Sequence, residues 1–318
     1  MRPVLSGYWQ TWNLPGRSRV PLTSVPTMYN EVILAFVAPD SEGVCRWAGG
    51  DIPTRACVRT LQNRGQRVLV SVGGGGVTVT LDTPARVRRF ADSLYTICRD
   101  LGLDGVDIDV EEGMMVTNNN PWNPTGTVKG VIDGIDAVMH SFPRGFMLTM
   151  APETLNLVGG IARYGGPWGN YLPIILHFGN RITRVHMQYY NSGSMFGVDF
   201  RPHNSGTVDF VVYLTEAIIK GFRIADTGVY YPGLHPNKVS VGLPATPRAA
   251  YNGFLTNAQI NEAFRRLTTG FRGPNEFCST PYNCLGGLMT WSVQWDATND
   301  YNFARNAQNS VLPMLTRR

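Results

Sequence analysis

Three acidic residues stand at alternate positions of the apolar segment Gly105–Glu111, namely Asp107, Asp109 and Glu111. In a β-strand, side chains at alternate positions share one face and follow each other at roughly 6.6 Å. The intervening residues are valine and isoleucine, a pattern typical of a buried strand. Buried carboxyl groups are costly unless they are protonated, hydrogen-bonded or bound to a metal. The row therefore predicts a chemical site rather than a solvated acidic edge.

Two kinds of chemistry fit such a row. A divalent metal ion would favour nearby histidine ligands, but the histidines are scattered, so we expect neither a metal nor a cofactor; they are His140, His177, His186, His203 and His235. The alternative is acid–base catalysis, because burial and mutual repulsion raise the pKa of one carboxyl group until it can donate a proton. Glu111 is last in the row and is the predicted acid. Asp107 and Asp109 would share a proton and hold the outer groups in place.

The segment that carries the row belongs to a repeating pattern of short runs rich in Val, Ile, Leu and aromatic residues. Such runs are typical of strands buried on both faces. Eight of them predict strands at Val4–Trp9, Glu31–Val37, Arg67–Gly73, Gly105–Glu111, Phe146–Ala151, Arg184–Tyr190, Lys238–Leu243 and Leu285–Trp291.

Helical patterns fill several of the gaps between these runs. Thr83 is a predicted N-cap, followed by Pro84 at the first helical position, and Gly102 is the predicted end of that helix. Thr256 and Gln259 predict a capping box at the start of another helix. Two further apolar stripes at helical spacing are Val131, Ile135, Val138 and Val211, Leu214, Ile218.

Eight strands that alternate with helices predict an α/β fold, a (β/α)8 TIM barrel. The second choice, a doubly wound open sheet, is disfavoured because no dinucleotide-binding fingerprint follows the first strand. The segment 118–126 (NNNPWNPTG) is too short to join two domains and predicts a long loop. We therefore expect residues 1–318 to form one catalytic barrel domain.

The ends of several predicted strands carry motifs of a known family. The segment 103–112 (LDGVDIDVEE) resembles the DxxDxDxE signature of glycoside hydrolase family 18, the chitinase family, and 71–74 (SVGG) resembles its SxGG motif. The segments 150–153 (MAPE) and 187–191 (MQYYN), together with Trp291, stand where that family has its strand-five, strand-six and strand-eight motifs. The resemblance covers essentially the whole chain and implies the same barrel.

The resemblance implies a retaining, substrate-assisted hydrolysis of glycosidic bonds. Glu111 would protonate the glycosidic oxygen and later activate water, while the 2-acetamido oxygen of the substrate attacks the anomeric carbon. Asp109 would orient the acetamido group, Asp107 would hydrogen-bond Asp109, and Asp104 would support the loop. No cofactor is implied.

The resemblance also implies residues that bind the substrate. Tyr190 would hydrogen-bond the acetamido carbonyl, although the adjacent Tyr189 makes this assignment ambiguous. Gln188 and Tyr190 resemble the Q-x-Y pattern of the plant-type and short bacterial branch. Trp291 would form the apolar floor under the distorted sugar.

Other candidates have a structural interpretation beside the functional one. Ser71, Gly73 and Gly74 predict a close-packed turn that gives the aspartates room, because no Lys-Ser/Thr follows as in a phosphate cradle. Glu153 is expected either to contact sugar hydroxyls or to brace its loop. The remaining predicted substrate contacts, for which ordinary packing is the alternative, are Tyr8, Phe36, Met150 and, as an exposed stacking platform, Trp122.

The composition excludes several classes of protein. With 43% hydrophobic and 16% charged residues, the chain is neither disordered nor a coiled coil. No apolar run reaches the roughly 18 residues of a membrane-spanning helix. The net charge of +5 does not come from a basic run interleaved with aromatic residues, and the densest cluster, at 86–89, predicts a solvated helix face. We therefore expect no nucleic-acid or membrane partner.

The cysteines bear on the cellular compartment. Cys45 with Cys57, and Cys278 with Cys284, flank polar loops that a disulfide could close, which would fit an exported protein. Reduced thiols in a cytosolic enzyme are the alternative, and Cys98 is expected to be a buried, inert thiol. The start of the chain shows no hydrophobic signal region, so we expect the mature form of a secreted protein.

One departure from the family pattern concerns the depth of the groove. Many members carry a small α+β insertion between strands seven and eight, whereas only about 41 residues separate Leu243 from Leu285, enough for a loop and a helix. The shallower groove favours endo cleavage, and the short Q-x-Y architecture favours a chitinase that acts on chitin or chito-oligosaccharides. We also expect a monomer. An endo-β-N-acetylglucosaminidase acting on N-glycans and a non-catalytic sugar-binding protein remain open alternatives.

Overall fold

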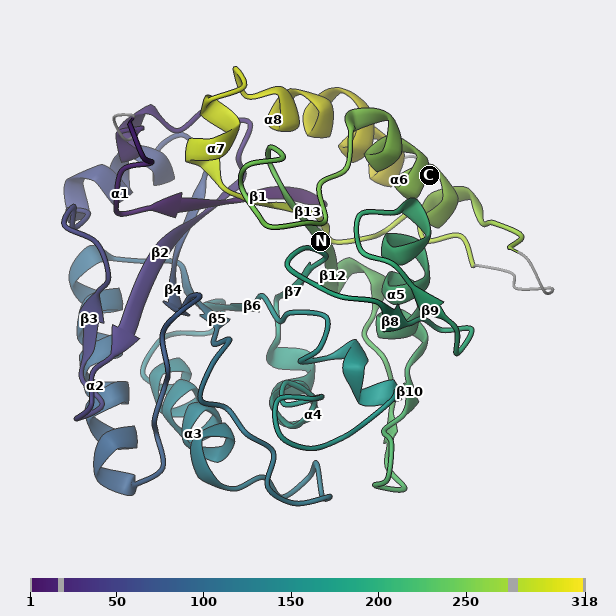
Figure 1. The fold of residues 1–318 in the computed structure, drawn as a ribbon. Helices are drawn as coiled ribbons and strands as arrows, with labels where there is room; N and C mark the ends of the chain where they lie inside the picture. The colour runs from purple at the N-terminus through teal and green to yellow at the C-terminus, as the bar shows by residue number, and fades with distance from the viewer. Residues whose placement is uncertain (1, 17–19, 274–279, 317–318) are drawn as a thin grey trace.

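The computed structural model describes residues 2–16, 20–273 and 280–316. In these residues parallel strands close into a barrel (Figure 1), because the first strand pairs with both the second and the last. The barrel strands are β1 (Val4–Gln10), β2 (Glu31–Pro39), β4 (Arg67–Gly73), β5 (Gly105–Asp109), β6 (Met147–Met150), β7 (Arg184–Gln188), β12 (Val239–Pro244) and β13 (Gly287–Trp291). The predicted (β/α)8 barrel is confirmed.

Helices surround the barrel and connect its strands (Figure 1). They are α1 (Arg55–Gln62), α2 (Pro84–Leu101), α3 (Gly126–His140), α4 (Leu172–Phe178), α5 (Val208–Lys220), α6 (Asn257–Thr269), α7 (Val293–Ala297), α8 (Asn302–Asn306) and α9 (Leu312–Thr316). Strand β3 (Cys45–Trp47) pairs antiparallel with β2. Two short hairpins are formed by β8 (Met195–Phe196) with β9 (Pro202–His203) and by β10 (Phe222–Arg223) with β11 (Tyr230–Tyr231).

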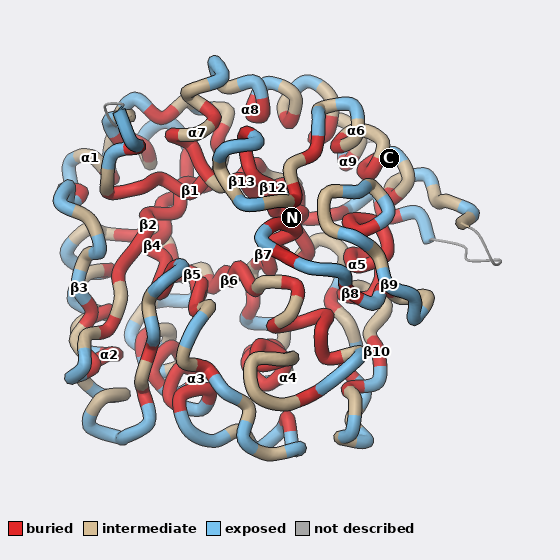
Figure 2. The backbone as a smooth tube through the Cα atoms, viewed as in Figure 1, coloured by how far each residue is buried: buried red, intermediate tan, exposed pale blue. Residues whose placement is uncertain are grey.

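The apolar side chains of the strands follow their alternation. Val106, Ile108 and Leu148 belong to the main core, which packs against the helices. A second, smaller cluster, which includes Tyr8 and Tyr190, lies apart from it. Figure 2 shows the barrel wall as an almost continuous buried ring, with exposed segments confined to loops and outer helix faces. The layer between the strands and the helices is therefore apolar, and the residues that point into the barrel form a separate group.

The predicted helix ends are confirmed where local chemistry determines them. Thr83 caps α2 by accepting a hydrogen bond from the amide of Arg86, and Gly102 ends it with a φ of 69°, a left-handed conformation that favours glycine. Thr256 and Gln259 form the predicted capping box of α6. The stripes expected at 131–138 and 211–218 lie in α3 and α5.

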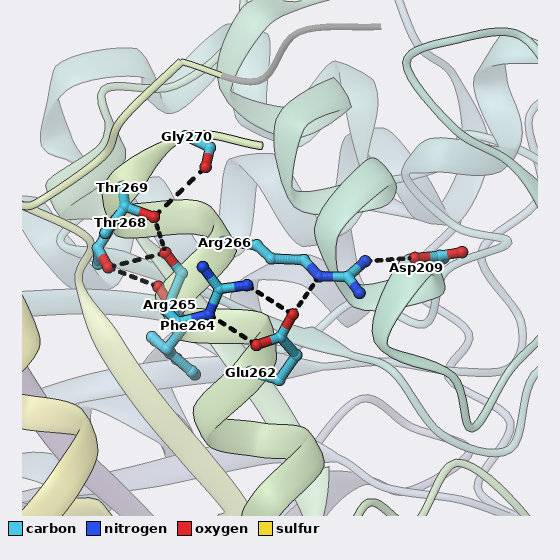
Figure 3. Close-up of polar contacts among 8 residues, drawn as sticks. All are labelled: Asp209, Glu262, Phe264, Arg265, Arg266, Thr268, Thr269 and Gly270. Carbon is cyan, nitrogen blue, oxygen red and sulfur yellow. Dashed lines mark hydrogen bonds and ion pairs between the residues drawn. The ribbon is translucent and has the colours of Figure 1, made fainter. Parts of the chain in front are cut away.

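Helices α5 and α6 are joined by an ion-pair network (Figure 3). The carboxylate of Glu262 accepts hydrogen bonds from Arg265 and Arg266, and Arg266 continues to Asp209 on α5 at 2.8 Å. The guanidinium hydrogen bonds lower the pKa of Glu262 to about 2. Because the network faces solvent, screening limits its contribution to stability.

The floor of the barrel holds a buried ion pair. Arg184 Nη2 donates to Glu31 Oε1 at 2.7 Å, and the two side chains are only 1% and 3% exposed. Ser6 donates to the other oxygen of Glu31 at 2.8 Å. Burial by itself raises the pKa of Glu31, but the charge and hydrogen bonds of Arg184 outweigh it and hold this pKa below its ordinary value. If either Arg184 or Glu31 were removed, the other would be left as a buried charge without its ion-pair partner.

Two predicted strands end two residues earlier than expected. Strand β5 stops at Asp109 and β7 at Gln188, so Glu111 and Tyr190 each lie two residues beyond a strand. After Asp109 the next amide, that of Val110, donates to the hydroxyl of Tyr171 at 2.8 Å instead of to a neighbouring strand. A side chain from elsewhere in the chain therefore ends the strand.

Of the two alternatives left open for Cys45 and Cys57, the structure has the reduced thiols, since both are free. Cys45 is buried beside α2, where its amide donates to Ser93 Oγ at 2.9 Å, whereas Cys57 lies in the first turn of α1 and accepts a hydrogen bond from Thr54. Burial raises the pKa of the Cys45 thiol to about 12. Burial also raises the pKa of Cys98, as expected for an inert thiol. The other expected pairing involves Cys278, which lies outside the described residues.

The connection between β12 and β13 is short. Its described residues contain α6 and loops, in agreement with the expected loop and helix. Across the described part of the chain, no helix is both long enough and apolar enough to cross a lipid bilayer.

Replacing Arg184 by methionine should leave Glu31 buried without its cation. We expect the free energy of unfolding to fall by about 3–5 kcal/mol, measured by denaturant-induced unfolding at pH 7. The matched control is Arg46→Met, which removes an arginine that is 70% exposed from its pair with Asp40 and should cause no detectable change. Equal effects of the two substitutions would contradict the role given to the floor pair.

Candidate active site

The acidic row lies at the carboxyl end of β5, inside the barrel. Asp107 and Asp109 are 0% and 4% exposed, whereas Glu111 lies beyond the strand and is partly exposed. Val106 and Ile108 face the helices, as strand alternation requires. The predicted common face of the two aspartates is confirmed, and Glu111 continues it at the mouth.

Asp107 is the innermost carboxyl group of the row and accepts three hydrogen bonds from hydroxyls. Tyr8 and Ser71 donate to Oδ2 at 2.6 and 2.7 Å, and Thr149 donates to Oδ1 at 2.5 Å. Burial raises the pKa of Asp107, while these hydrogen bonds oppose the shift. Among the described residues these are its hydrogen-bond partners, so the implied contact with Asp109 is not made in this conformation.

Asp109 accepts its hydrogen bond from the end of β7, which is separated from β5 by β6 alone. Gln188 Nε2 donates to Asp109 Oδ1 at 2.7 Å and to the carbonyl of Ala151 at 2.7 Å. Burial raises the pKa of Asp109 well above its ordinary value, and the charges of Glu111 and Asp107 raise it further. Asp109 is therefore held in place by an amide and surrounded by carboxyl groups, which favours its protonation.

The backbone on both sides of Glu111 is fixed by neighbouring segments. Tyr171, completely buried just before α4, accepts the amide proton of Val110 and donates toward the carbonyl of Val110 at 3.1 Å. On the other side, the amide of Val79 donates to the carbonyl of Glu112 at 3.1 Å. Glu111 is thus positioned although it lies outside regular secondary structure.

The carboxyl group of Glu111 titrates near neutral pH. Burial raises its pKa to about 7, helped by the charges of Glu153 and Glu112 and opposed by hydrogen bonding with Gln188. Burial also raises the pKa of Glu153, whose backbone forms a bridge with that of Gln188. A group with a pKa near 7 can both donate and accept a proton under physiological conditions.

The glycines after β4 allow close approach of the neighbouring chain. Gly73 has a φ of +115°, and a Cβ there would lie 2.3 Å from the carbonyl oxygen of Asp109. Gly74 donates its amide to that same carbonyl at 2.8 Å, and a Cβ on it would lie 2.5 Å from the ring of Phe36. The expected room is confirmed for the backbone of Asp109, and Gly74 makes room for Phe36 rather than for an aspartate.

An aromatic wall stands beside the row. Phe36 and Trp291 are stacked with centroids 5.6 Å apart at 11°, and Trp12 lies 6.1 and 6.2 Å from them. Tyr8 joins the cluster at 5.8 Å from Trp291. The peptide bonds Ala35–Phe36 and Trp291–Ser292 are cis. The site therefore combines aromatic ring faces from the wall with carboxyl groups from the row.

The row and the wall enclose one pocket of about 250 Å³. Its lining comes from loops and strand ends on both sides of the barrel: Trp12, Phe36, Ala48, Gly73, Gly75, Val77, Asp109, Glu111, Gln188, Tyr190, Asn191 and Trp291. Asp107, Ser71 and Thr149 lie beneath it as supports.

The ambiguity between the two tyrosines is resolved by their directions. Tyr190 lines the pocket with Asp109 and Glu111, and burial and these carboxyl groups raise its pKa well above its ordinary value. Tyr189 points into the outer core, where its hydroxyl lies 2.6 Å from that of Thr215 on α5. Tyr190 is therefore the tyrosine of the site.

Three predicted residues lie away from the pocket. Met150 is completely buried in the outer core, so its expected substrate contact is wrong, because strand alternation turns it toward the helices. Trp122 is 62% exposed but lines a separate hollow against α3 and α4, together with His177. Asp104 lies just before β5, at the opposite end of the strand from the site, where Arg67 donates to it at 2.8 Å.

Several residues of the site were not expected from the sequence, and Thr149, Trp12 and Tyr171 make the most specific contacts among them. Thr149 precedes Met150 on β6, and the alternation of that strand was a signal that could have identified it. Trp12 lies beyond the end of β1, where only proximity to Trp291 reveals its role. Tyr171 acts through a backbone contact between segments 61 residues apart, for which the sequence gives no local signal.

The donors around the row suit carboxylates rather than cations. Hydroxyl and amide N–H groups face Asp107 and Asp109. Within the described ranges, no group of three His, Cys, Asp or Glu side chains is placed to hold a metal ion.

Comparison with known proteins places this geometry in context. The family described as glycosyl hydrolases family 18 matches residues 4–136, which include β1 to β5 and the acidic row. Chitinase Chi52 of Paenibacillus xylanexedens is 35% identical over 94% of this chain and 60% of its own length. Endochitinase 37 of Trichoderma harzianum is 31% identical over 95% of this chain and 89% of its own.

The fold has a close counterpart among solved structures. A family GH18 chitinase from Chromobacterium violaceum superposes with a TM-score of 0.88 at 30% identity, covering 99% of this chain and 84% of that one. The chain thus spans about three fifths of the length of the Paenibacillus relative and most of the other two proteins.

The negative charge of Glu153 helps to keep the proton on Glu111. Replacing Glu153 by glutamine removes this charge, so the pKa of Glu111 should fall below its value of about 7, and its proton should leave at lower pH. The measurement is a carboxyl ¹³C NMR titration with labelled glutamate, with Glu111→Gln used to assign the signal.

The control for this titration is Asp133→Asn, which removes a carboxylate paired with Lys129 on the exposed face of α3 and should leave the pKa of Glu111 unchanged. An unchanged or higher pKa in Glu153→Gln would contradict the electrostatic role of Glu153.

Proposed function

The chain belongs to glycosyl hydrolases family 18, and on that basis we propose that it is an endo-acting chitinase, which hydrolyses β-1,4-linked N-acetylglucosamine polymers. The observation that carries the proposal is the buried row, in which Glu111 has a pKa of about 7 and shares a pocket with Trp291. A carboxyl group in this state is suited to general acid–base catalysis. The relatives named above support the substrate, since they are described as chitinases or an endochitinase.

The first step of the proposed reaction breaks the glycosidic bond. Glu111 gives its proton to the glycosidic oxygen, and the 2-acetamido oxygen of the substrate forms a bond to the anomeric carbon as the leaving sugar departs with the proton. The product of this step is an oxazolinium ion of the substrate itself. Partial burial supports this role, because it keeps Glu111 protonated until the substrate arrives.

Asp109 orients the acetamido group and offsets the positive charge that develops on it. The hydrogen bond from Gln188 fixes this side chain, and Tyr190, which lines the same pocket, donates to the acetamido carbonyl. An ionised Asp109 is favoured once the oxazolinium charge forms next to it, because opposite charges lower a carboxyl pKa.

Asp107 supports this change of charge from below. Hydroxyl hydrogen bonds from Tyr8, Ser71 and Thr149 stabilise its carboxylate, and its charge helps to raise the pKa of Asp109 before the substrate binds. Asp107 is therefore a positioning residue, and it does not touch the sugar in the proposed mechanism.

The second step restores the enzyme. Glu111, now ionised, takes a proton from water as the water oxygen attacks the anomeric carbon and the bond to the acetamido oxygen breaks. Because the carbon is attacked twice from opposite faces, the product retains its configuration. A pKa near 7 suits both the acid and the base role of one group.

The aromatic wall binds the sugar that undergoes reaction. Trp291 and Phe36 offer adjoining ring faces to the C–H groups of a pyranose, and the absence of a side chain at Gly74 lets Phe36 pack against the chain there. Glu153, beside Gln188, is a proposed contact for sugar hydroxyls. A neutral polysaccharide fits these surfaces, and no nucleic-acid or membrane partner is needed.

The endo mode and the organisation of the chain complete the proposal. In the described residues the connection from β12 to β13 contains one helix and loops, which supports an open groove that a polymer can enter along its length. We further propose that the barrel acts as one catalytic domain, as a monomer, and outside the cell, where chitin is found. Cys45 and Cys57 are free thiols, so this pair gives no support to the proposed location outside the cell.

Digestion of defined substrates tests the reaction. The protein should cleave N-acetylglucosamine oligomers internally, with little release of glycan from a high-mannose glycopeptide, as measured by mass spectrometry. Early ¹H NMR spectra should show the β anomer at the new reducing end before mutarotation. Early α product would exclude the oxazolinium route, and release from the glycopeptide alone would favour an endo-β-N-acetylglucosaminidase.

Replacing Glu111 by glutamine tests the acid. We expect turnover to fall at least about 100-fold, because one positioned acid is lost, while oligosaccharide binding measured by calorimetry persists. The control is Glu112→Gln, the adjacent carboxylate, which is exposed and accepts a hydrogen bond from Thr78 and should keep most of its activity. Wild-type turnover in Glu111→Gln would refute the mechanism, and binding without turnover in the unmodified protein would favour a sugar-binding function.

A further inference from the structure

Tyr251, in the loop after β12, has a side chain that is 94% exposed. This is the highest value among the exposed large hydrophobic residues in the described part of the chain. A tyrosine ring in water gains nothing for the fold, since its apolar faces are not removed from solvent. The ring of Tyr251 is therefore available to contact a binding partner.

The loop that carries Tyr251 is held firmly against the segment after β7. The amide of Tyr251 donates to Asn191 Oδ1 at 2.8 Å. Asn252 forms a reciprocal pair with the backbone of Ser192, accepting at 3.0 Å and donating at 2.9 Å. Ser205 donates to the same Asn252 oxygen at 3.2 Å. The ring is thus exposed on a well-anchored backbone.

The residues on both sides of Tyr251 pack against the wall of the active site. Ala250 contacts the buried cluster that contains Tyr8, Phe36 and Tyr190. Gly253 has a φ of +89°, and a Cβ there would lie 2.5 Å from both the carbonyl oxygen of Tyr189 and the Cα of Tyr190. Tyr251 therefore stands at the rim of the pocket.

The pocket itself is too small for a polymer. Its volume of about 250 Å³ lies below the roughly 300–1,000 Å³ that encloses a drug-sized ligand. Asn191, which binds the amide of Tyr251, is part of its lining. A chain of several sugars has to continue over the rim, and the loop at 250–253 forms part of that rim.

We propose that Tyr251 is a stacking platform for a pyranose unit of the substrate that lies outside the pocket. The apolar face of the sugar would cover the ring, as C–H groups pack on aromatic faces. The hydrogen bonds of Asn191 and Asn252 hold the platform in place before binding, which reduces the entropy lost on association. This inference rests on the proposed function, and it adds a binding position that the pocket does not contain.

A series of chito-oligosaccharides from trimer to hexamer tests the platform. Tyr251→Ala should lower kcat/KM for the hexamer by about 2- to 12-fold, the equivalent of about 0.5–1.5 kcal/mol for one aromatic contact. The loss should lie mainly in KM and should be smaller for the trimer, which does not extend as far. Tyr251→Phe should keep the wild-type kcat/KM for the hexamer, because phenylalanine has the same ring face.

The matched control is Tyr230→Ala, which removes a tyrosine that is 52% exposed on β11 and should leave the whole series unchanged. Thermal unfolding of each variant reports whether it is folded. A loss that is equal for trimer and hexamer, or an equal loss in Tyr230→Ala, would overturn the platform. So would a loss in Tyr251→Phe as large as that in Tyr251→Ala.

Calorimetry separates the platform from the proposed chemistry. In the Glu111→Gln background, Tyr251→Ala should weaken hexamer binding by a similar factor although no turnover occurs. Failure of the unmodified protein to hydrolyse any oligomer would refute the proposed function and leave this binding test intact. Unchanged hexamer affinity would overturn the platform even in an active chitinase, as would a concentration-dependent dimer, seen by sedimentation, that Tyr251→Ala abolishes.

Discussion

Burial of carboxyl groups inside the barrel is the constraint on which the rest of the site depends. The outer face of β5 must be apolar to pack against helices, so alternation turns Asp107 and Asp109 inward. A buried carboxyl group needs donors, and they come from β1, β4, β6 and β7 through Tyr8, Ser71, Thr149 and Gln188. The carboxyl groups of one strand are thereby matched by donors on four other strands of the barrel.

The charges inside the barrel are separated along its axis. At the floor Glu31 is matched by Arg184. Between the two ends of β7, His186 is buried and its pKa is lowered to about 3, so it stays neutral. Toward the mouth the carboxyl groups face hydroxyls and amides rather than a cation, and their pKa values rise. The same carboxylate chemistry therefore stabilises the fold at one end and holds exchangeable protons at the other.

Loops rather than strands form the upper part of the site. Glu111 and Tyr190 lie beyond the strands that lead to them, and their backbones are fixed by contacts from Tyr171 and Gly253. The loop at 250–253, between β12 and α6, is tied to Asn191 of the pocket lining. Local hydrogen bonds thus give the rim an order that regular secondary structure does not supply.

The sequence by itself determined the barrel, the helix caps and the row of acids, because alternation, helical periodicity and capping are local patterns that leave a direct trace in the chain. The resemblance to the family, rather than a local pattern, implied Gln188 and Trp291 at the ends of their strands. Only the tertiary structure decided which tyrosine enters the pocket, that Met150 faces the core, that Cys45 and Cys57 do not pair, and that Thr149, Trp12 and Tyr171 belong to the site. These features depend on contacts between segments far apart in the chain, and the pKa of Glu111 depends on burial that no local pattern specifies.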